Sequence, residues 1–319
     1  MNVNVERICR AKPITRICCI INKHSGTAGN APRPVLVELF SKHGITPDIL
    51  EPENAGSIRA LAEDAALRGY DIIVAAGGDG TVNAVASAIV GHGTIRLGVL
   101  PTGTLNHFAR DLGIPVELES AVDNIVAGNA RAVDVGEVNG RIFVNNSSLG
   151  LYPAIIRLRE TLQRSGFGKF PAAIWASVRI IARFRHLHLE LHSGLELPVH
   201  LTTAMLFVGN NAYEMSVNEL GQRRSIDSGQ LWIMLPTATN LWALLRSLFF
   251  IVTGREAAND LLTYETTELV VVSRRRSLNV AADGEVLQLQ APLTYRTLPK
   301  SLRVVVPAAT DEKRPRDSA

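Results

Sequence analysis

The segment at residues 77–83, GGDGTVN, constrains the fold of this chain more than any other feature. It follows the apolar run at residues 71–76 and opens an amphipathic helical pattern that continues through Val82. A strand that stops at glycines and restarts as a helix directs backbone N–H groups into the turn, where a phosphate accepts them. Asp79 inside the turn repels phosphate, so we expect it to hold Mg²⁺ or to position a reacting proton. The segment therefore predicts a site for a nucleoside triphosphate.

Two more turns share this character. The apolar run at residues 97–100 ends at Pro101, and TGTLN at residues 102–106 then leads into a helical pattern. NKHSG at residues 22–26 follows the apolar run at residues 17–21. Each turn alone is also compatible with an ordinary glycine turn that touches no ligand. Because the carboxyl ends of parallel strands meet at one sheet edge, the three turns together predict a single ligand crevice.

The composition favours a globular enzyme. With 319 residues, of which 46% are hydrophobic and 20% charged, the chain can bury a large core and is expected to form two domains. A net charge of only +3 does not indicate a nucleic-acid-binding protein. The three cysteines, at residues 9, 18 and 19, show no disulfide framework, which favours a cytoplasmic location. No signal peptide and no run of roughly 18 apolar residues is present, and the longest run, at residues 241–253, is interpreted as a buried helix.

The periodicity of the sequence changes near residue 134. Before it, apolar strand runs alternate with amphipathic helices predicted at residues 34–43, 57–68, 81–90 and 119–127. This alternation predicts a doubly wound parallel sheet that is covered on both faces. After it, antiparallel strands are predicted at residues 133–138, 141–144, 201–208, 231–235, 269–272 and 287–290, with Asn139–Gly140 as a hairpin turn.

Several segments together resemble one family. GGDGTVN, LPTGTLNHFARDLGIP at residues 100–115 and ADGE at residues 282–285 are similar to the signature segments of the diacylglycerol kinase catalytic-domain family. VNNSSLGL at residues 144–151 and TLPKSLRVVVP at residues 297–307 also fit. That family includes bacterial lipid kinases and the sphingosine and ceramide kinases. GGDGT alone is shared with NAD kinases, whereas PTGTLNHFAR is more specific to the lipid kinases.

The resemblance implies an arrangement of domains. It implies a nucleotide-binding α/β domain at residues 14–134 and a β-sandwich-like lipid-substrate domain at residues 135–307, with the active site in the cleft between them. It also implies that the last strand, near residues 302–306, returns to the first domain. The tail at residues 308–319 is expected to be disordered because it is polar and charged.

The expected reaction transfers a phosphoryl group from ATP to a lipid hydroxyl. Asp283 and Glu285 flank a glycine after the apolar run at residues 278–281, and a continuing strand would place both side chains on the same side. A hairpin turn at Asp-Gly is the alternative. In the family this segment carries the proposed catalytic acid, which puts Glu285 first as general base with Asp283 beside it. Asp79 remains a competing assignment.

The resemblance also implies the binding residues. The residues expected to contact ATP are Asn22, Ser25, Gly26, Gly77, Gly78, Asp79, Gly80, Thr81, Asn83, Gly103 and Thr104, and Asn106 is expected to tie two loops together. Bacterial members hold a structural Mg²⁺ with a loop that reads roughly Asp-Asp-Gly. Here that loop is Asp227-Ser228-Gly229, so the second acid is missing. The matching metal positions are Ser225, Ser228 and Gln230, with Asp227 as the nearby acid.

Other departures and alternatives remain. His107 replaces the usual acid of the second motif, and Glu51 lies where the family has a threonine. The basic and apolar stretch between residues 155 and 188 is expected either to lie against an anionic bilayer, at the inner face of the membrane, or to pack on its own domain. Family members often pair, so a homodimer is one expected state. The alternative functions are an NAD kinase-like soluble kinase and a non-catalytic lipid- or nucleotide-binding protein.

Overall fold

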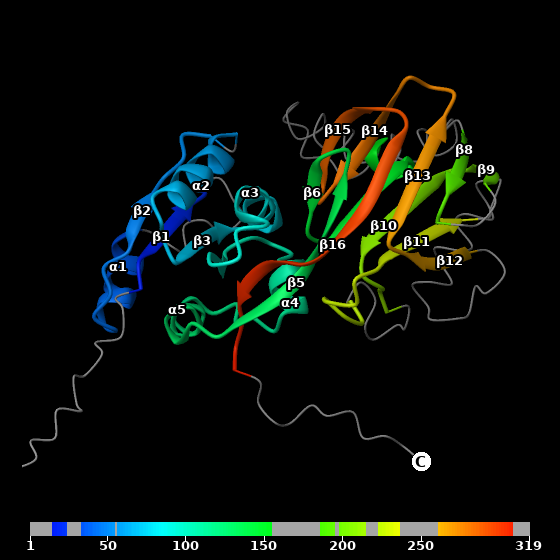
Figure 1. Cartoon of the computed structure of the whole chain (residues 1–319). Coiled ribbons are helices and arrows are strands. Elements are labelled where there is room, and N and C mark those ends of the chain that lie inside the picture. The colour runs from blue at the N-terminus through cyan, green and yellow to red at the C-terminus, as the bar shows by residue number, and fades with distance from the viewer. Residues whose placement is uncertain are drawn as a thin grey trace, which may run out of the picture.

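The computed structural model describes residues 15–23, 33–54, 56–154, 186–194, 198–214, 223–236 and 261–308. Figure 1 shows a lobe of strands covered by helices and a second lobe built from strands, with the long strand β16 (Leu293–Val305) running between them. Several sequence predictions lie outside the described residues, namely Ser25, Gly26, the run at residues 241–253, the tail from residue 309, and residues 155–185 of the basic stretch.

The first lobe has a parallel sheet at its centre. Four strands pair in the order β2 (Asp48–Leu50), β1 (Ile17–Ile21), β3 (Ile72–Gly77) and β4 (Arg96–Pro101), all parallel. Every residue of β1 and β3 is buried, as expected for strands that are covered on both faces.

Helices cover both faces of this sheet. On one face, α2 (Ser57–Leu67), α3 (Asp79–Ile89) and α4 (His107–Asp111) pack on alternate strand residues. On the other face, α1 (Arg33–Ser41) and α5 (Leu118–Ala127) pack on the intervening strand residues. The doubly wound α/β fold that was predicted from the sequence is therefore confirmed. The four helices predicted by periodicity all form, with ends within two residues of the expected ones.

The second lobe consists of two packed sheets. One sheet has six antiparallel strands in the order β12 (Leu261–Thr266), β11 (Leu231–Pro236), β10 (Met205–Asn210), β7 (Asn146–Gly150), β14 (Ser277–Ala282) and β15 (Glu285–Gln290). The facing sheet contains β5 (Ala130–Val138), β6 (Arg141–Phe143), β8 (Leu187–His192), β9 (Val199–Thr203), β13 (Glu268–Ser273) and β16. Their apolar side chains form one core, in which the Phe143 and Tyr295 rings meet edge to face at 6.3 Å.

Strand β16 connects the two lobes. It pairs parallel with β4 through Arg303 and Val304, and antiparallel with β5 along eight positions. Its first part also pairs antiparallel with β13. The register on β5 shifts between Leu298 and Leu302, and this irregularity lets one strand serve the β-sandwich and then the parallel sheet. The last strand in the described part of the chain therefore completes the sheet that holds the first strands.

One strand prediction needs correction, and strand β7 was missed. The apolar run at residues 201–208 forms two strands, β9 and β10, in different sheets, because the chain changes sheet at Ala204. The Thr203 hydroxyl donates to the backbone carbonyls of Met205 and Pro236 at this corner. Strand β7, with sequence NSSLG, was not predicted because serine and asparagine are poor strand formers. It forms because Ser147 and Ser148 are fully buried between two paired strands.

None of the helices in the described part of the chain is long and apolar enough to cross a membrane.

Candidate active site

The GGDGTVN segment forms the strand-to-helix turn that the sequence predicts. β3 ends at Gly77, Gly78 is the extended N-cap, and α3 begins at Asp79. The N–H groups of Thr81 and Val82 donate to the Gly78 carbonyl, which starts the helix. The first N–H groups of a helix have no intrahelical partner, and the helix dipole makes this end positive. The turn is therefore suited to a phosphate.

Thr81 lies beneath this turn. Its side chain is buried, and its hydroxyl accepts a hydrogen bond from the Asn22 side chain at 3.0 Å. A Cβ atom on Gly77 would come within 2.3 Å of the Thr81 hydroxyl oxygen, so only glycine fits there. Asn22 and Thr81 thus hold the end of β1 against the start of α3. Within the turn, Gly80 and Asn83 are the residues that face the open cavity described below.

Asp79 connects this turn to the second motif. Its two carboxylate oxygens accept hydrogen bonds from the N–H groups of His107 and Phe108, at 3.2 and 3.1 Å. These groups belong to the first turn of α4, so a carboxylate from one loop caps the helix that follows the other. His107 thus contributes its backbone rather than a polar tie from its side chain.

The expected role of Asn106 is corrected by the structure. Its side chain accepts a hydrogen bond from the Gly103 N–H and donates to the carbonyls of Pro101 and Gly103. The Asn106 side chain therefore stabilises its own loop, in which the Asn106 backbone is left-handed. Gly103 touches the first loop directly, since a Cβ there would lie 2.4 Å from the Gly78 Cα. The two loops are therefore joined by Asp79 and by this close glycine contact. Thr104 lies on the exposed part of the second loop.

The ADGE segment forms a hairpin turn between β14 and β15. Asp283 and Gly284 occupy the turn with φ values of +46° and +83°. The alternation argument that put Asp283 and Glu285 on one side of a single strand was therefore wrong, because the chain reverses between them. Asp283 turns inward and Glu285, the first residue of β15, is exposed.

Backbone amides hold the Asp283 carboxylate. Its oxygens accept from the N–H groups of Val144, Asn145 and Asn146, at 2.7, 2.9 and 3.0 Å. Desolvation by burial raises the pKa of Asp283 to about 6, against the lowering effect of these donors and of the Arg223 guanidinium. Glu285 pairs with Ala282 through its backbone, but its carboxylate makes no hydrogen bond or ion pair with any residue in the described part of the chain. Of these two acids, Glu285 is the one whose carboxylate is uncommitted.

One cavity brings the two halves of the chain together. It has a volume of about 360 Å³ and lies between α2 and α3 of the first lobe and the β6 and β14–β15 hairpins of the second. Its lining residues are Gly56, Arg59, Gly80, Asn83, Ala84, Ser87, Arg141, Ile142, Ala282, Asp283, Glu285 and Leu287. The phosphate-compatible turn and the ADGE acids thus face the same space. Arg59 and Arg141 were not predicted, because neither lies in a motif.

The predicted metal loop lies apart from this cavity. The Asp227 carboxylate forms an ion pair with Arg131 at 2.9 Å and accepts from the Ser225 hydroxyl at 3.0 Å. Burial alone would raise its pKa, but these two contacts hold the pKa of Asp227 below the ordinary value. The Ser228 hydroxyl donates to the Asn211 side chain.

These donors do not fit a divalent ion. A cationic guanidinium already neutralises the only carboxylate of the Ser225, Asp227, Ser228 and Gln230 set. Within the described ranges, no group of three or more His, Cys, Asp or Glu side chains could hold a metal. Nearby, Asp134 accepts from the N–H groups of Gly229 and Lys300, so the protein's own backbone organises this loop.

Glu51 also forms an ion pair within the protein. Its carboxylate lies 2.6 Å from the Lys23 ammonium and links the ends of β2 and β1. This ion pair lies where the family has a threonine.

Comparisons with known proteins agree with this geometry. Residues 16–138 match the family described as the diacylglycerol kinase catalytic domain, and residues 163–306 match the YegS C-terminal NAD kinase beta sandwich-like domain. A diacylglycerol kinase of Bacillus subtilis is 29% identical over 285 residues, which cover 87% of this chain and 91% of the relative. A Pseudomonas aeruginosa protein named "Probable lipid kinase YegS-like" is 29% identical over 259 residues, covering 80% and 83%.

The fold is also found in solved structures. The crystal structure of a diacylglycerol kinase from Bacillus anthracis superposes with a TM-score of 0.64 at 17% identity, covering 93% of this chain and 98% of the other. At this identity the similarity concerns the fold alone. It extends over both lobes.

Proposed function

We propose that this chain is a lipid kinase of the diacylglycerol kinase catalytic-domain family and transfers the γ-phosphate of ATP to a hydroxyl of a lipid such as diacylglycerol or a sphingoid base. The observation that carries this proposal is the cavity that Gly80 and Asn83 share with Asp283 and Glu285. Phosphoryl transfer requires alignment and neutralisation of charge, together with an acid near the attacking hydroxyl. Both requirements meet in this cavity.

The nucleotide is proposed to bind along the loops of the first lobe. Gly80 leaves room for a phosphate to approach the backbone, because no atom lies within 4 Å of a Cβ placed there, and the close contact of Gly78 with Gly103 fixes the two loops relative to each other. ATP fits here because this open space lies at the first turn of α3, where backbone N–H groups can receive phosphate oxygens. The remaining proposed contacts are Asn22, Ser25, Gly26, Asp79, Thr81, Asn83 and Thr104.

Glu285 is proposed as the general base. It lines the cavity with an exposed carboxylate, whereas Asp79 and Asp283 already accept backbone N–H groups through both of their oxygens. A base must offer a free lone pair to the hydroxyl proton. Asp283 then maintains the shape of the turn that presents Glu285, and Asp79 maintains the joint between the two nucleotide loops.

We propose MgATP as the phosphoryl donor. When bound, Mg²⁺ supplies positive charge that neutralises the triphosphate. Arg141 lines the cavity from β6 and adds positive charge from the protein itself, whereas Arg59, which lines it from α2, pairs with Glu63 at 2.9 Å. The loop at residues 225–230 is not proposed to hold a second ion, because Arg131 neutralises Asp227.

The lipid is proposed to enter from a membrane surface. The basic stretch between residues 155 and 188 supports contact with the anionic inner leaflet, by the charge of its sequence. We assign nucleotide binding to residues 14–134 and lipid binding to residues 135–307. Salt-dependent binding to anionic vesicles tests the membrane contact, and sedimentation equilibrium tests the proposed homodimer.

Transfer of radiolabel from [γ-³²P]ATP into a lipid extract is the experiment that tests this function. The expected result is a labelled phospholipid that the wild-type protein forms and the Glu285→Gln variant does not. Parallel reactions contain NAD in place of lipid. Labelled NADP would favour the NAD kinase-like alternative. Binding of ATP and lipid without transfer would favour a non-catalytic protein.

A further inference from the structure

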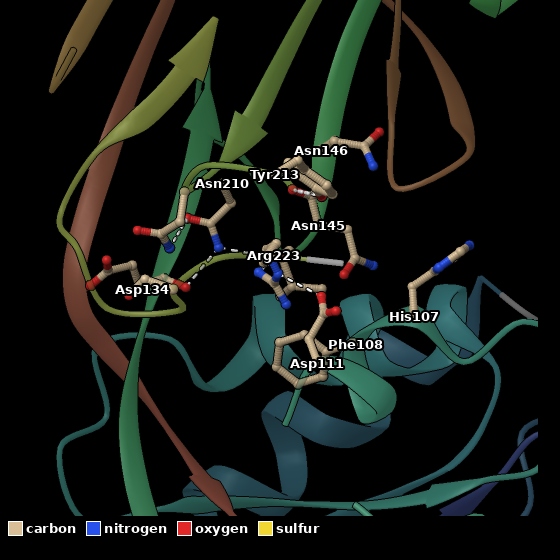
Figure 2. A network of polar contacts seen from close by, with 12 residues as sticks. His107, Phe108, Asp111, Asp134, Asn145, Asn146, Asn210, Tyr213 and Arg223 are labelled. Atoms are coloured by element: carbon tan, nitrogen blue, oxygen red, sulfur yellow. Dashed lines mark hydrogen bonds and ion pairs between the residues drawn. The ribbon is translucent and has the colours of Figure 1, made fainter. Parts of the chain in front are cut away.

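A buried ion pair fastens the nucleotide lobe to the segment that holds Asp283. The Arg223 Nε lies 2.6 Å from the Asp111 carboxylate, and the two side chains are only 1% and 5% exposed. Figure 2 shows Asp111 on α4 pointing up to Arg223, with Asn145 beside it. The guanidinium also lies 5.6 Å from the centre of the Phe108 ring, on the same short helix. Arg223 therefore contacts α4 through an ion pair with Asp111 and a cation–π contact with Phe108.

The same arginine contacts the segment beneath the ADGE turn. Its Nη1 donates to the Val144 carbonyl at 2.8 Å, and the N–H of Val144 donates in turn to Asp283 at 2.7 Å. Tyr213, which bridges to Arg223 in the backbone, donates its hydroxyl to the Asn145 carbonyl at 3.0 Å. Arg223 and Tyr213 thus hold the carbonyls of the same peptide groups whose N–H groups bind Asp283.

Helix α4 completes the connection on its other side. It is five residues long, and Asp79 accepts the N–H groups of its first two residues, His107 and Phe108. Asp111 is its last residue. About one turn of helix therefore separates the carboxylate of the GGDGT loop from the ion pair that supports the Asp283 segment.

We propose that Arg223 and Asp111 are positioning residues that fix the Asp283 turn, and with it Glu285, relative to the nucleotide loops. This inference rests on the proposed function for its catalytic consequence. Neither residue lines the cavity, so both act through the residues they hold. A lysine at position 223 would preserve the charge but could not bridge Asp111 and the Val144 carbonyl with one planar group.

The electrostatic surroundings of Asp283 give this proposal a specific readout. The charged groups around it are Arg223 behind the 144–146 segment, Glu285 on β15, and Arg59 and Arg141 across the cavity. Arg223 favours the ionised carboxylate. Removing this charge should therefore move the acidic limb of the kcat/KM profile to higher pH, which a purely structural brace would not do.

The test compares Arg223→Gln and Arg223→Lys with Arg224→Gln. Arg224 is the matched control, because its guanidinium forms an exposed ion pair with Glu214 at 3.0 Å. The expected result for Arg223→Gln is a fall in kcat of about 30-fold or more, a KM for ATP within about threefold of wild type, and an acidic limb displaced upward by roughly 0.5–1 pH unit. Arg223→Lys should keep the position of the limb but not the full kcat. Arg224→Gln should match wild type.

A second variant guards against simple unfolding. Asp111→Leu combined with Arg223→Met replaces the buried pair by apolar side chains of similar size, which commonly preserves stability. A well-folded double variant with reduced kcat and a displaced limb supports the proposal. A wild-type kcat in this double variant would overturn the proposal. So would a loss of kcat in Arg223→Gln that disappears at low temperature while the acidic limb of the pH profile stays where it is in wild type.

Hydrogen exchange separates this inference from the proposed function. The amides of Val144, Asn145 and Asn146 should exchange faster in Arg223→Gln than in wild type. In Arg224→Gln their exchange rates should equal those of wild type. If the wild-type protein transfers no phosphate, the proposed function fails while this measurement still decides the positioning role. Equal exchange in all three proteins would overturn the inference.

Discussion

Asp79 in the first lobe and Asp283 in the second use the same interaction in different surroundings. Each carboxylate accepts backbone N–H groups from a distant segment: 28 and 29 residues away for Asp79, and 137 to 139 residues away for Asp283. Asp79 caps a helix within its own lobe. Asp283 holds three successive peptide groups between two strands, and burial raises its pKa to about 6.

This difference suggests different roles for the acids at the two sides of the cavity. Asp79 stabilises the joint of two loops, so its removal should affect stability as much as chemistry. Asp283 adds a pH-dependent element, because its charge is desolvated. Glu285 is held by neither arrangement, and for this reason we propose it as the general base. The predictions below separate these three roles.

Glu285→Gln should have the largest effect on turnover. A general base contributes about 10²- to 10⁴-fold to rate, so kcat should fall by that factor. The free energy of unfolding should stay within about 0.5 kcal/mol of wild type, because Glu285 is exposed. Phosphate transfer measured beside urea unfolding checks both. Turnover near the wild-type rate would show that Glu285 is not the general base and would leave Asp79 or Asp283 as the candidate.

Asp79→Ala should reduce stability as well as activity. It removes two hydrogen bonds to a charged acceptor at the start of α4, at a cost of about 2–4 kcal/mol. Asp79→Asn, which retains one acceptor oxygen, should recover part of the stability. Urea unfolding of the two variants gives the comparison. A fully stable Asp79→Ala protein would mean that the helix cap contributes little.

Asp283 should impose opposite pH trends on activity and stability. Its pKa in the folded protein, about 6, lies above the ordinary value of 3.8, so between these values the folded state binds more protons than the unfolded one. Its contribution to stability therefore declines as pH rises through this window. Activity should decline as pH falls below about 6, because the protonated acid holds its amides less well.

The measurement is urea unfolding and kcat/KM between pH 4 and 8. In wild type the Asp283 contribution should give up to tenfold loss of kcat/KM per pH unit on the acidic side. Asp283→Asn should remove this component from both profiles while lowering the overall rate. Profiles of identical shape in the two proteins would show that another group sets the acidic limb.

Asp227→Asn should have the smallest effect. Asp227 pairs with an Arg131 that is about half exposed, and such pairs contribute roughly 0–1 kcal/mol. Calcium and magnesium should not raise the melting temperature of either protein in the absence of nucleotide. A clear rise in wild type that disappears in Asp227→Asn would restore this loop as a metal site.

Much of the fold could be predicted because its signals are local. Apolar runs followed by glycine turns located β1, β3 and β4, and helical periodicity located α1, α2, α3 and α5. The turn after β3 located Asp79, and the ADGE segment of the family resemblance located Asp283 and Glu285, which line the cavity. Strand β7 escaped because burial between two strands outweighs the low strand preference of its serines.

The support for the site could not be predicted in this way. Arg223 and Asp111 are 112 residues apart, and no spacing rule relates them. The inward turn of Asp283 depends on a positive φ and on peptide groups of a strand end far away in sequence. Arg59 and Arg141 reach the cavity only because the two lobes come together.

Strand β16 also has a consequence for biosynthesis. The only partner of β4 on its outer side within the described residues is β16, which is translated after every other strand. A ribosome-bound chain that ends before residue 293 therefore carries the nucleotide lobe with an unpaired sheet edge, which is prone to pair with other chains. The nucleotide lobe therefore completes its sheet only after residues 293–305 have been synthesised, so the two lobes reach their final state together rather than in succession.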